Sequence, residues 1–209
     1  MRLLIDLDNT LVDRAGAFVR WTHGFLAELA GAPTADPEQV AWLLDADRDG
    51  YTPRAELAEA IIDRYGLPVP VDALVDRLLF EHVRFVEPYP GVVERLRTMD
   101  AAVVTNGTVA QQEAKLRHAG LERYLADAVI SERIGAKKPD PAVFRAALGG
   151  SDPADAWMVG DHPEADIAGA RELGLRTAWV SHGRTWMQSW QPTVIAPTTA
   201  EALDAIVGN

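Results

Sequence analysis

Short apolar runs, rich in β-branched residues, alternate along the chain with segments in which apolar positions recur at helical spacing. The runs are the candidate strands, and they cover 2–7, 101–106, 127–131, 156–161, 176–181 and 193–196. Continuous apolar runs of this length are typical of strands buried on both faces, and their alternation with helices is typical of a parallel sheet. The pattern therefore predicts an α/β fold in which a parallel sheet carries helices on both faces.

The alternation is interrupted once, in the long interval between the first and second candidate strands. Helical spacing recurs within this interval, at 16–30, 37–45, 53–65 and 71–85. The proline-rich segment "VEPYPG" (86–91) then leads back to the strand pattern. We therefore expect an all-helical domain at 14–88, inserted into a core domain made of 1–13 and 89–209.

Composition narrows the possible functions. The 209 residues, 48% of them hydrophobic, suffice for one core and a smaller domain, and the absence of cysteine leaves oxygen or histidine as metal ligands. No apolar stretch reaches ~18 residues, and Asp6 interrupts the first run, so we expect a cytoplasmic protein without a membrane span or signal peptide. The formal charge of −11, without a Lys/Arg cluster, argues against nucleic acid and membrane partners.

Polar side chains follow four of the candidate strands, at the point where each strand ends. They are Asp6 and Asp8 after the first, Thr105 and Asn106 after the second, Lys138 beyond the third, and Asp161 and Asp166 after the fourth. In an open parallel sheet, ligands bind at the carboxyl ends of the strands. The sequence therefore predicts that these side chains face one site.

The residue types at this edge indicate what the site binds. Carboxylates of Asp6 and Asp161, with Asp166 as a further candidate, would repel one another strongly without a cation, and an oxygen-only ligand set suits Mg²⁺. Thr105 precedes a helix whose N-terminal amides favour an anion, and Lys138 adds a positive charge. A metal, a hydroxyl, amides and a lysine together predict a bound phosphate group.

Four segments of the chain resemble a known family. The segments "DLDNT", "TNG", "KKPDP" and "GDHPEAD" appear in the order and separation of the signature segments of the haloacid dehalogenase (HAD) superfamily. The helical insert resembles the cap that this family carries after its first core strand, so the similarity covers the whole chain. The resemblance implies a Rossmann-like core and a two-step phosphoryl transfer through an aspartyl-phosphate.

The same resemblance implies a role for each motif residue. Asp6 would be the nucleophile and a Mg²⁺ ligand, and Asp8 would be the general acid/base that also offers its backbone carbonyl to the metal. Thr105 and the amide of Asn106 would hold the phosphoryl oxygens. Lys138 would neutralise the nucleophile and the phosphate. Asp161 would ligate Mg²⁺, and Asp166 would do so directly or through water.

These roles describe a Mg²⁺-dependent hydrolase of a small-molecule phosphomonoester, acting as a monomer or homodimer. A sugar phosphomutase built on the same core is the alternative that stays open. A 2-haloacid dehalogenase is disfavoured, because dehalogenases of this family typically have a non-acidic residue at the position of Asp8. Phosphonate cleavage would need a lysine from the cap, and residues 14–88 contain none.

The segment "DADRDGYTPRAE" (45–56) suggests a different class of function, a calcium-binding module. It satisfies the EF-hand spacing, with acidic residues or glycine at Asp45, Asp47, Asp49, Gly50 and Glu56. Thr52 replaces the usual aliphatic residue, however, and Pro53 occupies a ligand position. We expect a turn between two cap helices here, with the calcium module as an alternative.

Overall fold

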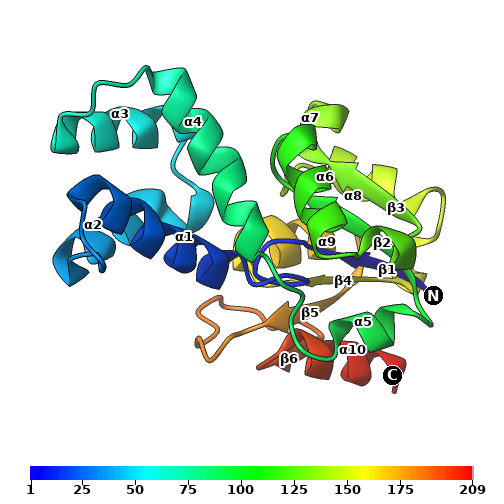
Figure 1. The fold of residues 1–209 in the computed structure, drawn as a ribbon. Coiled ribbons are helices and arrows are strands. Elements are labelled where there is room, and N and C mark those ends of the chain that lie inside the picture. The colour runs from blue at the N-terminus through cyan, green and yellow to red at the C-terminus, as the bar shows by residue number, and fades with distance from the viewer. Residues whose placement is uncertain (209) are drawn as a thin grey trace. The chain divides into compact units, whose positions relative to one another are not determined.

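The computed structural model describes residues 1–208 and contains a parallel sheet of six strands, in the order β3-β2-β1-β4-β5-β6 (Figure 1). The strands are β1 (Arg2–Ile5), β2 (Asp100–Thr105), β3 (Asp127–Ile130), β4 (Ala156–Gly160), β5 (Arg176–Val180) and β6 (Val194–Ala196). Each coincides with one of the runs expected from the apolar pattern, and β2 begins one residue before its run. The predicted α/β fold with a parallel sheet is therefore confirmed.

The strand order places β1 at the centre, hydrogen-bonded to β2 on one side and β4 on the other. Leu4 pairs in register with Ala102 of β2 and with Met158 of β4. Leu4 and Met158 are completely buried, as an apolar run without polar alternation predicts for a strand covered on both faces. The chain moves outward in one direction through β2 and β3 and in the other through β4 to β6, so the switch point lies beside β1.

Helices cover the two faces of the sheet. Those outside the insert are α5 (Val92–Leu96), α6 (Val109–His118), α7 (Ser131–Ile134), α8 (Pro141–Leu148), α9 (Gly169–Glu172) and α10 (Thr199–Val207), with the short turns η3 (Glu122–Tyr124), η4 (Pro153–Asp155) and the π-helical η5 (Pro163–Ala168). Helices α8 and α9 pack together on one face, and α5 and α10 pack together on the other (Figure 1). Phe144 of α8 packs with Leu4 and Met158 in the core beneath it.

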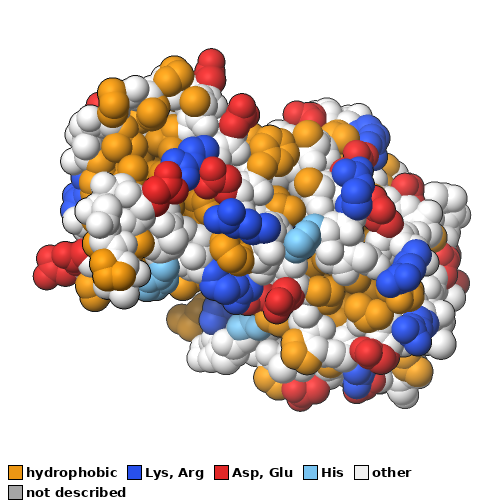
Figure 2. Space-filling view, viewed as in Figure 1, with side chains coloured by type: hydrophobic (Ala, Val, Ile, Leu, Met, Phe, Trp, Pro, Cys, Tyr) orange, Lys and Arg blue, Asp and Glu red, His pale blue; other side chains and the backbone are white. Residues whose placement is uncertain are grey.

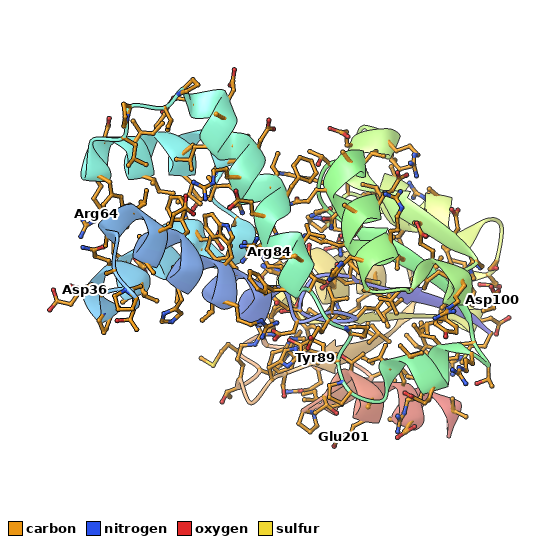
Figure 3. The ribbon with its side chains drawn as sticks, viewed as in Figure 1. Asp36, Arg64, Arg84, Tyr89, Asp100 and Glu201 are labelled. Carbon is orange, nitrogen blue, oxygen red and sulfur yellow. The ribbon has the colours of Figure 1, made fainter. Side chains whose placement is uncertain are left out.

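Short polar side chains cap several of the helices. The carboxylate of Asp36 accepts a hydrogen bond of 2.8 Å from the amide of Glu38 at the start of the second cap helix, and Asp140 accepts one of 2.8 Å from Ala142 at α8. The amide of Glu201 donates to the Thr198 hydroxyl at 3.2 Å; Asp36 and Glu201 are labelled in Figure 3. These contacts satisfy amides that the helix itself leaves unpaired.

The segment between β1 and β2 is all-helical, as expected. It contains α1 (Arg14–Ala30), α2 (Pro37–Asp47), α3 (Arg54–Tyr65) and α4 (Val71–Phe80), with the 3₁₀ turns η1 (Arg48–Gly50) and η2 (Glu81–Phe85). Inter-residue contacts separate the unit Arg14–Glu87 from a unit made of the rest of the chain. That the chain folds as two domains, with boundaries at 13/14 and 88/89, stays a prediction.

The segment that resembles an EF-hand is the turn between α2 and α3. Arg48 and Asp49 adopt left-handed backbone conformations, with φ of 49° and 53°. The Asp47 carboxylate is buried and lies 2.6 Å from a guanidinium nitrogen of Arg14 and 2.6 Å from one of Arg54. Burial alone would raise the pKa of Asp47, but the two guanidinium charges hold it below its usual value. Asp47 thus pairs with arginines, and the structure gives the calcium alternative no support there.

Charge is spread over the surface of both units. On the face shown in Figure 2, basic and acidic side chains are interspersed rather than gathered by sign. No helix within residues 1–208 has both the length and the apolar character that crossing a bilayer requires.

Candidate active site

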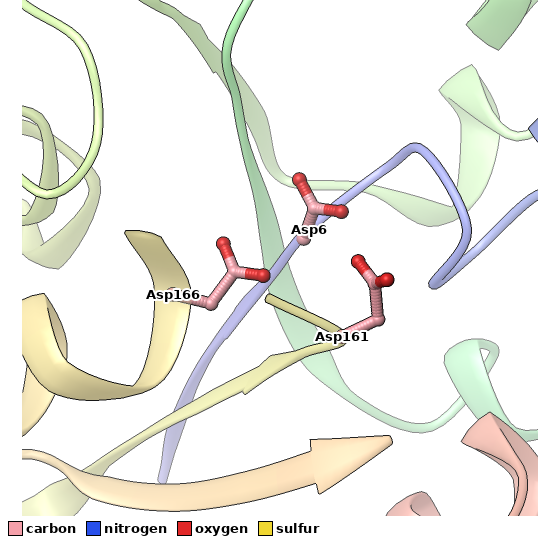
Figure 4. A group of neighbouring side chains, drawn as sticks. All are labelled: Asp6, Asp161 and Asp166. Atoms are coloured by element: carbon pink, nitrogen blue, oxygen red, sulfur yellow. The ribbon is translucent and has the colours of Figure 1, made fainter. Parts of the chain in front are cut away.

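Three carboxylates meet at the carboxyl ends of β1 and β4. Asp6 directly follows β1, and its amide donates to the carbonyl of Val159 in β4 at 2.9 Å. Asp161 directly follows β4, and Asp166 lies in η5. Each of the three offers a carboxylate oxygen within 4.8 Å of the others, and Figure 4 shows them gathered around one point. The adjacency of β1 and β4 brings these residues together across a long stretch of sequence.

The turn from β4 into η5 is shaped to hold Asp166. A Cβ added to Gly160 would lie only 2.5 Å from the Cβ of Asp166, so a side chain at position 160 would displace that aspartate. The amide of His162 donates to Asp166 Oδ2 at 2.9 Å. The imidazole of His162 in turn accepts a hydrogen bond of 3.0 Å from the amide of Ala165, and so caps η5. Asp166 is thereby held buried beside Asp6.

Lys138 inserts its ammonium group between two of these acids. Its Nζ lies 2.5 Å from Asp6 Oδ1 and 2.7 Å from Asp166 Oδ1, and its side chain is almost fully buried. Burial opposes the charged form, but the charges of Asp166 and Asp6 prevail and raise the pKa of Lys138 above its usual value. Lys138 is therefore a permanent cation in this site.

Asn106 holds the backbone at Lys138 in place. Its side-chain amide donates to the carbonyl of Lys138 at 3.1 Å and accepts from the amide of Lys138 at 2.8 Å. The two hydrogen bonds tie the end of β2 to the loop before α8.

The amides of Gly107 and Val109 donate to Ser131 and Glu132, at 2.9 Å and 2.8 Å. The amide of Gly107 in the loop after Thr105 and the amide of Val109 at the start of α6 therefore have partners within the protein.

The carboxylate cluster carries more negative charge than Lys138 neutralises. Burial raises the pKa of Asp6 to about 7, with Lys138 opposing this rise and Asp166 adding to it. Burial likewise raises the pKa of Asp161 to about 8, with Asp166 and Asp6 adding to the effect and Arg184 opposing it. Three clustered carboxylates with oxygen as the only donor type form a ligand set that fits a divalent cation such as Mg²⁺.

The Asp8 carboxylate turns toward α6 instead of joining the cluster. Lys115 of α6 lies 2.8 Å and 2.7 Å from its two oxygens. Gln112 of α6 donates to Asp8 Oδ2 at 3.1 Å and to the hydroxyl oxygen of Thr105 at 2.5 Å. Thr105 itself is buried at the end of β2. The nucleophile candidate and the acid/base candidate therefore have separate cationic partners.

The sequence interpretation missed Gln112, Lys115 and Arg184. Gln112 and Lys115 occupy, with Leu116, the buried face of α6. Because both are polar, the apolar periodicity of the helix gave no signal for them. Arg184 lies in the loop after β5, where it donates to Asp161 Oδ2 at 3.1 Å and to the Asp161 carbonyl at 2.8 Å. Nothing in its local sequence marks this contact.

A family model described as haloacid dehalogenase-like hydrolase matches residues 3–180. The chain belongs to this family. A glyceraldehyde 3-phosphate phosphatase from Pyrococcus abyssi is 30% identical over 207 aligned residues, which cover 87% of this chain and 82% of that HAD relative. The HAD-hydrolase YfnB from Bacillus subtilis, solved bound to magnesium, has the same fold, with a TM-score of 0.78 at 22% identity over 98% of this chain and 97% of YfnB.

Other relatives match a part of their own length. A phosphoserine phosphatase from Thermus thermophilus is 44% identical over 91 residues, which are 43% of this chain and 36% of that protein. The chain thus spans well under two thirds of this relative. The predicted HAD family and the predicted fold are nevertheless confirmed, because the family model and the Pyrococcus relative cover most of the chain.

Proposed function

We propose that this HAD-family chain is a Mg²⁺-dependent phosphatase that hydrolyses a small phosphorylated metabolite through an aspartyl-phosphate. The observation that carries the proposal is the buried contact of Lys138 with both Asp6 and Asp166, beside Asp161. A nucleophilic carboxylate, a fixed cation and further oxygen ligands are what phosphoryl transfer to an aspartate requires. The phosphatase activities named for the relatives support the same class of substrate.

Asp6 is the proposed nucleophile. Lys138, 2.5 Å away, favours the ionised form of this carboxyl against the effect of its burial. Asp6, Asp161 and Asp166, with the backbone carbonyl of Asp8, would hold Mg²⁺. When bound, Mg²⁺ supplies positive charge that reduces the repulsion between the attacking carboxylate and the phosphoryl oxygens.

Thr105 is proposed to bind the phosphoryl group, together with the amide of Asn106. The Thr105 oxygen already accepts a hydrogen bond of 2.5 Å from Gln112. A hydroxyl has one proton to donate, and the contact with Gln112 leaves that proton for a phosphoryl oxygen. The Asn106 side chain meanwhile fixes the backbone of Lys138, which is proposed to neutralise the same phosphate.

Asp8 is the proposed acid and base in the two steps. Asp8 begins this reaction as the carboxylic acid. An oxygen of Asp6 forms a bond to phosphorus while the ester oxygen departs with the proton of Asp8. Water then attacks the phosphorus and gives a proton to Asp8, and the bond from phosphorus to Asp6 breaks. The products are the alcohol and inorganic phosphate, and both aspartates return to their starting state.

The experiment is a screen of sugar phosphates, nucleoside monophosphates and organic-acid phosphates in Mg²⁺, with phosphate release and isomer formation measured in parallel. Steady phosphate release without an isomer is expected. Asp6→Asn should abolish it in a folded protein, because an amide is a poor nucleophile. Asp127→Asn, at the exposed start of β3, is the matched control and should retain it.

Two outcomes would contradict the proposal. Phosphate release by Asp6→Asn at the wild-type rate would exclude this nucleophile. Interconversion of sugar-phosphate isomers with little phosphate release would indicate the phosphomutase instead.

A further inference from the structure

The chain has three lysines, and two of them are buried against carboxylates. Lys138 contacts Asp6, and Lys115 contacts Asp8 with 3% of its side chain exposed, whereas Lys137 is exposed. Burying a lysine is unfavourable unless its charge is paired. The fold therefore maintains Lys115 at this position through its contact with Asp8.

Gln112 lies one turn before Lys115 on the same face of α6 and is completely buried. Its side-chain amide donates to Asp8 at 3.1 Å, to the Thr105 hydroxyl at 2.5 Å and to the Asn106 carbonyl at 3.3 Å. A single amide group thus connects Asp8 to the end of β2.

The backbone around this amide leaves room for it. A Cβ at Gly107 would meet the Gln112 side chain at 3.0 Å, and Gly107 has a φ of +148° that other residues rarely adopt. The loop after β2 is therefore shaped around Gln112.

We infer that Lys115 and Gln112 are a positioning pair, which fixes the direction of the Asp8 carboxylate relative to the hydroxyl of Thr105. The inference rests on the proposed function, in which Asp8 transfers the proton and Thr105 holds the phosphoryl group. The backbone at Asp8 is already held, since the amides of Leu11 and Val12 both donate to the Leu7 carbonyl at 3.0 Å. Side-chain rotation is the freedom that remains, and the two contacts from α6 remove it.

Orientation of Asp8 matters for some substrates more than for others. An alkyl phosphate must receive a proton on its leaving oxygen, whereas p-nitrophenolate departs without one. In a reaction through a covalent intermediate, kcat/KM reports binding and the first irreversible step, and does not report hydrolysis of the intermediate. A loss of Asp8 orientation should therefore lower kcat/KM for an alkyl ester and spare it for p-nitrophenyl phosphate. General acid catalysis contributes about 10²–10⁴-fold, so we expect Lys115→Met to lower kcat/KM for an alkyl phosphate by about 10–100-fold.

The second chemical step is common to all esters and uses Asp8 as the base. Lys115→Met should therefore lower kcat for p-nitrophenyl phosphate when that step limits turnover, while its kcat/KM changes by less than about threefold. In an Asp8→Asn background, Lys115→Met should have no further effect on this ester, because a positioning residue acts through the residue it holds.

The experiment compares wild type, Lys115→Met, Gln112→Met, Asp8→Asn and the double variant Asp8→Asn/Lys115→Met, with Lys137→Met as the control. Lys137→Met removes a lysine of equal charge from the exposed loop and should behave as wild type. Thermal melting checks folding. If Lys115→Met does not fold, Gln112→Met is compared in its place. It should lower kcat/KM more for the alkyl phosphate than for p-nitrophenyl phosphate, and the loss of Gln112 leaves no buried charge unpaired.

Equal losses of kcat/KM for the alkyl and the nitrophenyl ester would overturn the inference. A further loss in the Asp8→Asn background would overturn it as well, because Lys115 would then act on the substrate or on the fold. Failure of the proposed function is a separate result, in which wild type releases no phosphate from either ester.

Discussion

Asp161→Asn should stabilise the metal-free protein at pH 8. Burial, with the charges of Asp166 and Asp6, raises the pKa of Asp161 from 3.8 to about 8. The folded protein therefore keeps a proton that the unfolded chain releases as the pH rises from about 4 to about 8. Stability falls across that window, because the folded state binds more protons than the unfolded state. The variant lacks the titrating group and avoids this loss.

The size of the effect follows from the pKa difference. Each pKa unit corresponds to about 1.4 kcal/mol, which sets an upper limit of about 6 kcal/mol at pH 8. The Asp161 side chain is 15% exposed, and the substitution also removes its contact with Arg184, which is 48% exposed. Solvent access and the lost contact both reduce the gain, and we expect about 2–4 kcal/mol. For a protein of this size, that corresponds to a rise in Tm of about 5–12 °C.

The assay is thermal unfolding in EDTA between pH 5 and pH 8, repeated at pH 8 with Mg²⁺. The advantage of Asp161→Asn over wild type should be largest at pH 8 and shrink toward pH 5. Mg²⁺ should raise the Tm of wild type and have a much smaller effect on the variant. Asp127→Asn is the control. A variant that melts no higher than wild type at pH 8, or an advantage that does not vary with pH, would refute the reasoning.

Four further outcomes are expected. Asp47→Asn should lower the free energy of unfolding by about 3 kcal/mol in urea denaturation, because Arg14 and Arg54 lose the carboxylate that pairs with both. Calorimetry of wild type should show no Ca²⁺ binding at this turn. Gly160→Ala should weaken Mg²⁺ binding at least about tenfold in calorimetry, since its Cβ displaces Asp166. Dialysis against EDTA should abolish phosphate release, with Mg²⁺ but not Ca²⁺ restoring it, because the looser coordination of Ca²⁺ disturbs the in-line geometry.

The convergence of the acids could be anticipated because it depends on a simple property of parallel sheets. An apolar run such as 3–5 must be covered on both faces, and the first acid after it must then lie at the carboxyl edge. The same holds for Asp161 after β4. The apolar pattern did not specify that β4 pairs with β1, since that pairing joins segments with no local sequence relation.

The contacts of α6 were beyond the reach of the sequence for a different reason. Gln112 and Lys115 are polar, so a periodicity argument assigns them to a solvated face. They are buried because their partners, Asp8 and Thr105, belong to other elements and supply polar contacts in place of solvent. The EF-hand spacing of 45–56 has a different explanation, since acidic residues and glycine also suit a helix end followed by a left-handed turn, as expected there.

Asp6 and Asp8, the two acids that follow β1, contact different cations. Lys138, from the loop before α8, contacts Asp6, and Lys115, from α6, contacts Asp8. A single cation shared by both carboxylates would draw them together, and two carboxylates close together favour a shared proton over two independent roles. Separate cations on different elements would allow the proposed division of roles, in which one acid attacks phosphorus while the other transfers a proton. Asp6 and Asp8 are therefore suited to distinct tasks because cations from two different elements pair with them.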